Sequence, residues 1–223
     1  MERIVTIGMG RASSERAVAL ARTHPGVRAA IGVHPHDAAG FADADLEWMR
    51  ALAAAPEVVA IGECGLDYYR DHSPRDLQAR AFSAQIALAR EVGLPLVIHT
   101  RDAARDTLDM LAAEAGDHPV ILHCFSLPEH LDEVLERGYM LSFAGPVTYR
   151  RSHELQRAAA RAPLERLLVE TDSPYLAPEP RRGRPNRPAN VAHTLAFIAR
   201  LRDMPADALD AATSANAARV FGW

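Results

Sequence analysis

The stretch VVAIGE, at residues 58–63, is a short apolar run that ends on a carboxylate. Three later stretches repeat the pattern: PLVIH at 95–99, PVILH at 119–123 and RLLVETD at 166–172. A strand directs successive side chains to opposite faces, so a ligand at its last residue lies at the rim of the sheet. In a parallel barrel, all such rims lie at the same end. The end residues are therefore candidate ligands of one metal site: Glu63, His99, His123 and Asp172.

These donors predict the metal and its chemistry. Two carboxylates and two imidazoles suit a divalent ion such as Zn, Mn or Mg that works on water. We assign Glu63 and Asp172 catalytic roles as well, because Asp172 can bind metal through one oxygen and accept a proton with the other. A structural histidine at either strand end, or a salt bridge from Glu63 to an arginine, is the alternative. Two histidines at equivalent places on neighbouring strands favour the metal site.

Short apolar runs alternate with helical patterns along the whole chain, which predicts an α/β fold with a parallel sheet covered by helices. Predicted strands are 3–7, 29–33, 58–62, 95–99, 119–123, 139–143 and 166–170. Predicted helices are 13–23, 43–54, 75–92, 103–115, 128–137, 152–161, 190–202 and 205–219. Ligands at four strand ends favour a TIM-type (β/α) barrel over an open doubly wound sheet. We expect one domain over 1–223. Seven strands are predicted where a complete barrel needs eight, so a first strand and helix are expected to be missing.

Composition limits the class of protein. An apolar fraction of 48% and a charged fraction of 24% over 223 residues are typical of a globular protein. No apolar run is long enough to span a membrane, and two cysteines give no disulfide framework, so we expect a cytoplasmic enzyme with no membrane partner. All 25 basic residues are arginine, which excludes lysine Schiff bases and P-loop lysines. The net charge of −4 gives no overall attraction to nucleic acid, so such binding must be local.

Three further features are candidate substrate contacts. His34 and His36 follow the second predicted strand and are ligands, phosphate donors or loop residues. Arg101 lies two residues after His99 and either binds a phosphate or pairs with a neighbouring aspartate. The loop 174–188 carries four arginines and is either a phosphate-backbone contact or a solvated surface.

Six motifs together resemble one family, the TatD-type metal-dependent deoxyribonucleases. They are GVHPHD at 32–37, IGECGLDYY at 61–69, VIHTRDA at 97–103, ILHCFS at 121–126, VETDSPYLAP at 169–178 and NAARVFG at 216–222. The resemblance implies a TIM-barrel hydrolase with a divalent metal centre that cleaves phosphodiester bonds of DNA, often as a 3′–5′ exonuclease. It implies that Glu63 is a bridging carboxylate, that His99, His123 and Asp172 are ligands, and that His34 and Arg101 lie near the substrate phosphate.

Two departures from the family pattern modify these expectations. The family's first strand, with its His-x-His pair, is not found in the sequence, and Arg187 falls where glutamate is usual. We therefore expect one tight metal at Glu63, His99 and His123, a second that is weak or absent, and low nuclease activity. The expected partner is DNA, and the expected state is a monomer. The alternatives are an ester or amide hydrolase, such as an aminoacyl-tRNA deacylase, and a degenerate barrel that binds metal or nucleic acid with little turnover.

Overall fold

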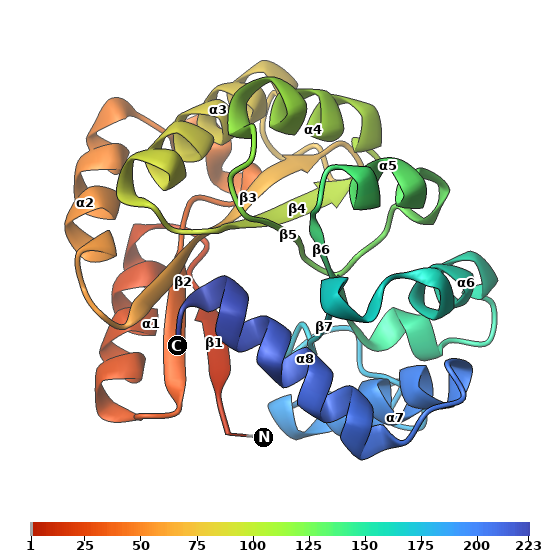
Figure 1. Cartoon of the computed structure of the whole chain (residues 1–223). Helices are drawn as coiled ribbons and strands as arrows, with labels where there is room; N and C mark the ends of the chain where they lie inside the picture. The colour runs from red at the N-terminus through yellow and green to blue at the C-terminus, as the bar shows by residue number, and fades with distance from the viewer. Residues whose placement is uncertain (1) are drawn as a thin grey trace. The chain divides into compact units, whose positions relative to one another are not determined.

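The structure is a computed structural model that describes residues Glu2–Trp223 (Figure 1). It divides into two compact units, Met1–Ile121 and Leu122–Trp223. The described residues contain seven strands, the number predicted from the sequence. The expectation of one domain over 1–223 stays a prediction.

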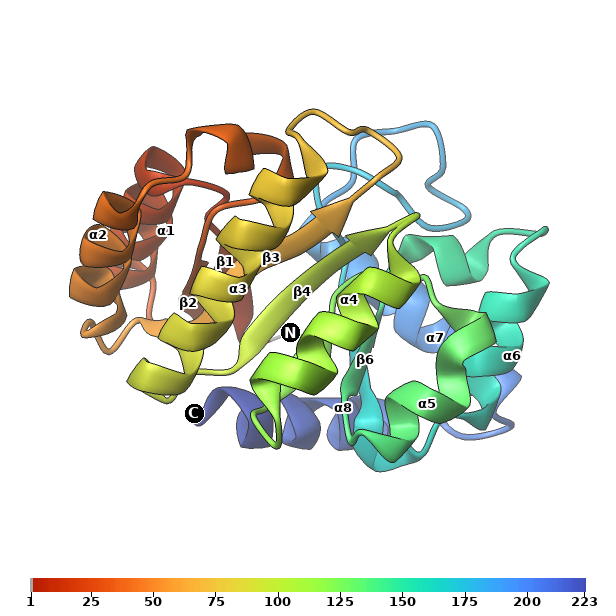
Figure 2. The same ribbon diagram turned by 90° about the horizontal axis from the view of Figure 1, so that it is seen from above.

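The first unit is built on parallel strands in chain order. Its strands are β1 (Ile4–Ile7), β2 (Val27–Ile31), β3 (Val58–Asp67), β4 (Leu96–Arg101) and the start of β5 (Val120–Leu122). Its helices are α1 (Arg11–Thr23), α2 (Asp43–Ala53), α3 (Arg75–Val92) and α4 (Ala104–Met110), with a 3₁₀ segment at Pro35–Gly40 and a π-helical turn at Leu111–Ala115. The four helices cover the outer face of these strands (Figure 2). This arrangement directs the carboxyl ends of β2, β3 and β4 to one edge.

Helix α3 shows how the sequence sets these bounds. Pro74 precedes the helix, where a fixed φ and a missing N–H cost nothing. Gly93 ends it in the left-handed conformation, with φ 70°. The side of α3 that carries Phe82 and Ile86 is fully buried against the sheet, and β3 is buried at all ten residues. The predicted range of this helix, 75–92, is confirmed.

The second unit has a shorter pair of parallel strands, β6 (Met140–Phe143) and β7 (Leu167–Val169). Its helices are α5 (Leu131–Glu136), α6 (His153–Arg161), α7 (Val191–Leu201) and α8 (Ala206–Phe221), and α7 packs against α6 and α8. Short 3₁₀ segments are Pro128–His130, Gly145–Thr148, Leu164–Arg166 and Pro188–Asn190. The Asn216 amide of α8 donates to the backbone oxygens of Leu164 and Leu167, which ties the last helix to β7.

Strand β3 is longer than predicted and extends five residues past Gly62, to Asp67. Gly62 and Gly65 both lie inside this strand, where the absence of a side chain allows close backbone packing. Gly65 has φ +137°, a region that L side chains rarely adopt, and a Cβ there would collide with the backbone oxygen of His99. The expectation that Glu63 is the last residue of its strand is therefore wrong, and His99 likewise lies two residues before the end of β4.

We expect Gly65→Ala to lower the free energy of unfolding by about 3 kcal/mol, because the substitution adds backbone strain to overpacking at His99. Chemical denaturation monitored by circular dichroism measures the loss. Gly40→Ala is the matched control, since a Cβ at Gly40 meets nothing within 4 Å. Equal stability of the two variants would contradict the tight approach of β3 to β4.

Candidate metal centre

Three potential ligands converge in the first unit, from β3, β4 and the turn after β2. The ligand atoms of His34, Glu63 and His99 all lie within 4.8 Å of one another. Glu63 Oε1 is 2.8 Å from His99 Nδ1 and 3.5 Å from His34 Nε2. Glu63 is only 7% exposed, so its negative charge is held away from bulk water. This group is the candidate metal centre.

The chemistry of the Glu63–His99 contact fits a divalent ion. The other ring nitrogen of His99, Nε2, lies 3.0 Å from Asp67 Oδ2. A neutral imidazole that donates Nε2–H to Asp67 presents the lone pair of Nδ1 to Glu63. Two electron-rich atoms 2.8 Å apart need a shared cation or a proton between them. An imidazole nitrogen and a carboxylate oxygen are common ligands of Zn and Mn.

Asp67 hydrogen-bonds to the ring nitrogen of His99 that does not face Glu63. Its Oδ2 accepts from His99 and, at 2.9 Å, from His36 Nε2, while Oδ1 accepts the backbone N–H groups of Tyr69 and Arg70. Burial disfavours the charged carboxylate, but the hydrogen bonds from His99, Arg70 and His36 outweigh it and hold the pKa of Asp67 well below its usual range. The residue therefore fixes the tautomer and orientation of His99, a role typical of residues behind a metal ligand.

Asp67 is not among the site residues predicted from the sequence, so this role was missed. The available signal was spacing: Glu63 and Asp67 are four residues apart, and such residues share a face in a strand. Because β3 was expected to end at Gly62, the alternation was not followed to Asp67.

A backbone hydrogen bond defines the tautomer of the neutral His34 ring. Its Nδ1 accepts the backbone N–H of His36 at 3.1 Å, so the neutral ring carries its proton on Nε2. That proton is directed toward Glu63, which makes His34 a hydrogen-bond donor at the edge of the group instead of a metal ligand. His36 uses its Nε2 for Asp67, and burial lowers the pKa of His36 against the effect of that hydrogen bond.

Arg101 ends β4 and stacks on an exposed aromatic ring. Its guanidinium carbon lies 3.8 Å from the centre of the Tyr69 ring. Asp106, a neighbouring aspartate, instead accepts the hydroxyl of Tyr68 at 2.7 Å.

Cys64 follows Glu63 but is fully buried. Burial, and to a smaller extent the charge of Glu63, raises the pKa of its thiol well above the usual range. Thiolate chemistry is therefore not available at this position.

The second unit carries its own group of ligand-type residues. His123 Nδ1 lies 2.8 Å from Glu170 Oε1, and His123 Nε2 lies 3.9 Å from Asp172 Oδ1. Glu170 also accepts the backbone N–H of Cys124 and the hydroxyl of Ser142. Glu170 therefore orients the His123 ring and leaves Nε2 as the nitrogen that faces Asp172. Sequence reasoning selected Asp172 but not Glu170, which is two residues earlier.

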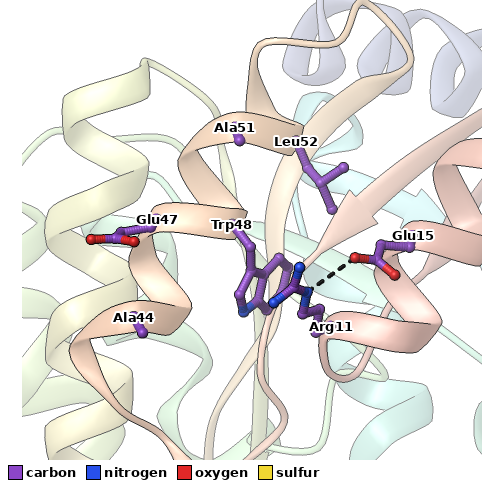
Figure 3. A pocket seen from close by; sticks show the side chains of 7 residues that line it. All are labelled: Arg11, Glu15, Ala44, Glu47, Trp48, Ala51 and Leu52. Atoms are coloured by element: carbon purple, nitrogen blue, oxygen red, sulfur yellow. Dashed lines mark hydrogen bonds and ion pairs between the residues drawn. The ribbon is translucent and has the colours of Figure 1, made fainter.

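Two pockets of the first unit lie outside the candidate centre. One, of about 440 Å³, lies between α1 and α2 and is lined by Arg11, Glu15, Ala44, Glu47, Trp48, Ala51 and Leu52 (Figure 3). Arg11 Nε donates to Glu15 there at 3.0 Å, an exposed pair of the kind that contributes little to stability. This pocket contains none of the predicted site residues.

Comparisons with known proteins agree with the resemblance noted in the sequence. The family model described as TatD related DNase matches residues 1–222. "Uncharacterized metal-dependent hydrolase YabD" of Bacillus subtilis (strain 168) is 41% identical over 223 residues, which cover 99% of this chain and 88% of the relative. "3'-5' ssDNA/RNA exonuclease TatD" of Cronobacter turicensis is 41% identical over 228 residues, 99% of this chain and 87% of the relative. The crystal structure of YJJV, a TatD homolog from Escherichia coli K12, matches with a TM-score of 0.93 at 28% identity and covers 100% of this chain and 87% of that one.

Fold and site thus define a metal-dependent hydrolase of the TIM-barrel type, which confirms the predicted fold class. The chain belongs to the TatD related DNase family. In the part of the chain that the structure describes, no helix has the length and apolar character needed to cross a membrane. The cytoplasmic location and the monomeric state stay predictions.

Proposed function

We propose that this protein hydrolyses phosphodiester bonds of nucleic acid, as a 3′–5′ exonuclease on DNA, with a divalent metal ion at Glu63 and His99. The observation that supports it most is the contact of Glu63 with His99, held from behind by Asp67. The name of the Cronobacter relative, an exonuclease of single-stranded DNA and RNA, supports the same substrate class.

The ion would polarise the phosphodiester and lower the pKa of a water molecule. Glu63 and His99 would hold it, and Asp67 would keep the His99 ring in the ligating tautomer. His34 would donate Nε2–H to a phosphate oxygen, because its Nδ1 is already occupied. Arg101, already aligned by Tyr69, would add a bidentate phosphate contact.

The remaining assignments come from the sequence and stay predictions. His123 and Asp172 are the expected further ligands, and Asp172 is the expected proton acceptor. The contact of Glu170 with His123 Nδ1 is compatible with both, because it leaves Nε2 to act as a ligand. His36 was expected to bind substrate, and its bond to Asp67 leaves only Nδ1 for that purpose.

The deciding experiment measures nucleotide release from a 5′-labelled single-stranded DNA in Mn, Mg or Zn, and in EDTA. We expect stepwise shortening from the 3′ end with a metal and none in EDTA. Deacylation of aminoacyl-tRNA without shortening of DNA would replace the proposal by the ester-hydrolase alternative. No turnover at saturating Mn or Mg would favour the degenerate barrel.

We expect one tightly bound ion per chain. Among residues Glu2–Trp223, ligand atoms of three metal-type side chains converge at a single place, that of His34, Glu63 and His99. Elemental analysis after dialysis against metal-free buffer measures the content. Two equally retained ions would show that a second set of residues binds as strongly.

We expect His34→Ala to lower kcat/KM on DNA about 10- to 100-fold, the usual effect of losing a hydrogen bond to a charged group. The content of bound metal should be unchanged, because His34 presents an N–H and not a lone pair. The same substitution at His24, exposed at the end of α1, is the control. Loss of the ion in His34→Ala would instead identify His34 as a ligand.

A further inference from the structure

The loop between β7 and α7, residues 174–188 (light blue in Figures 1 and 2), is long, but hydrogen bonds hold it to neighbouring segments. Asn186 is 4% exposed, and its amide donates at 2.7 Å to the backbone oxygens of Thr171 and Tyr175. Its Oδ1 accepts from the backbone of Arg187 and from Asn190. A buried asparagine that satisfies four partners holds the base of the loop in one conformation.

The far side of the loop is fixed against the segment that follows β6. The backbone N–H of Glu179 donates to Thr148 Oγ1 at 2.9 Å, and the Tyr149 hydroxyl donates to the oxygen of Ala177 at 3.2 Å. The guanidinium of Arg182 lies 4.3 Å from the centre of the Tyr149 ring. The loop therefore lies beside Arg150 and Arg151, which directly follow Tyr149.

These two segments together present six exposed arginines, here called the arginine surface: Arg150, Arg151, Arg181, Arg182, Arg184 and Arg187. Within Glu2–Trp223 none of the six forms a salt bridge with a carboxylate. Exposed arginines elsewhere in the same unit do: Arg157 pairs with Glu154, and Arg161 with Asp132 at 2.8 Å. A concentration of unpaired cations on a protein of net charge −4 is a local site for a polyanion.

An aromatic side chain accompanies the cations. Tyr175 is 67% exposed, while its backbone N–H donates to the backbone oxygen of Asp172 and its backbone oxygen accepts from the Asn186 amide. A ring in solvent on a fixed backbone costs little entropy when a flat partner stacks on it. Arginines that follow a backbone, together with exposed rings, are the usual means of binding single-stranded nucleic acid.

We propose that the arginine surface and Tyr175 form a binding site for single-stranded nucleic acid, in which the arginines contact phosphates and Tyr175 stacks on a base. Tyr175 lies three residues after Asp172, and none of the proposed binding residues belongs to the Glu63–His99 group. The inference rests on the proposed function for its choice of ligand. It adds a set of residues that bind the nucleic acid strand and that differ from the residues that cleave it.

The test is fluorescence anisotropy of a labelled 12-nucleotide single strand, titrated in EDTA over a range of salt concentrations. Arg181→Gln with Arg184→Gln should reduce the slope of log K against log salt by about 1.4 and the affinity by about 25-fold at 0.1 M salt. The matched control is Arg157→Gln with Arg161→Gln, which removes the same charge from exposed positions of the same unit and should leave the slope within about 0.3 of the starting protein. Melting temperatures verify that both double variants are folded.

Tyr175 is tested separately. Tyr175→Ala should weaken binding about 5- to 100-fold with an unchanged salt slope, whereas Tyr175→Phe should bind normally, because stacking needs the ring and not the hydroxyl.

Equal salt slopes for the two arginine double variants would overturn the proposal, as would equal binding by the alanine and phenylalanine variants at 175. Displacement of the strand by poly-glutamate of equal charge at equal concentration would overturn the choice of nucleic acid. Binding in EDTA needs no turnover, so a protein that binds in this way but releases no nucleotide would contradict only the proposed function.

Discussion

Glu63→Gln is expected to lower the hydrolytic rate on the order of 10³-fold at saturating metal, and to lose most of the bound ion. The glutamine keeps the shape of the side chain but removes the charge that faces His99 Nδ1 at 2.8 Å. Initial rates of nucleotide release and elemental analysis of the same samples measure both effects.

Glu91→Gln is the control for this substitution. Glu91 is a carboxylate of α3 paired with Arg50, and both side chains are about half exposed, so its neutralisation should leave rate and metal content within about twofold. Retention of both rate and ion in Glu63→Gln would remove Glu63 from the metal centre.

Asp67→Asn is expected to lower kcat at least 100-fold and metal affinity about 10- to 100-fold, although Asp67 is not itself among the residues whose ligand atoms converge in the candidate centre. An asparagine amide can present N–H groups to His99 and His36, where the carboxylate accepts from both. The His99 ring would then move its proton to Nδ1, the nitrogen that must hold the ion. Loss of this buried acceptor should also lower the free energy of unfolding by about 3 kcal/mol.

The decisive measurement for Asp67→Asn is the rate at metal concentrations high enough to restore occupancy. Stability is followed by denaturation of the metal-free protein. Asp71→Asn, in which an exposed carboxylate loses its pair with Arg75, is the control and should change neither quantity appreciably. Full recovery of kcat at high metal would limit the role of Asp67 to affinity and contradict its effect on the ring's tautomer.

The fold was largely predictable because its local signals agree. Strand–helix alternation, Pro74 before α3 and Gly93 after it are consistent with one another, and α3 has the predicted bounds. The end of β3 was not predictable in this way, because Gly62 and Gly65 look like a turn in the sequence. The reason for the two glycines is clear only from the structure. A Cβ at Gly62 would collide with Val97, and a Cβ at Gly65 would collide with the backbone of His99.

The site was predictable in its residue types but not in its connections. Glu63 and His99 were expected to lie together, and they do. The roles of Asp67 and Glu170 depend on which ring nitrogen each faces, and that is a property of side-chain orientation. The tautomer of His34 likewise depends on a single backbone N–H, that of His36, which no spacing rule reports.

Asn186 has a consequence for how such a protein can diversify. The loop 174–188 owes its conformation to backbone groups held by Asn186, Thr148 and Tyr149, and not to the side chains at 181, 184 or 187. Those positions can therefore exchange arginine for other residues while the loop keeps its conformation. In the proposed binding role of this loop, single substitutions there would change the preference for one polymer over another, while Glu63, Asp67 and His99 stay as they are.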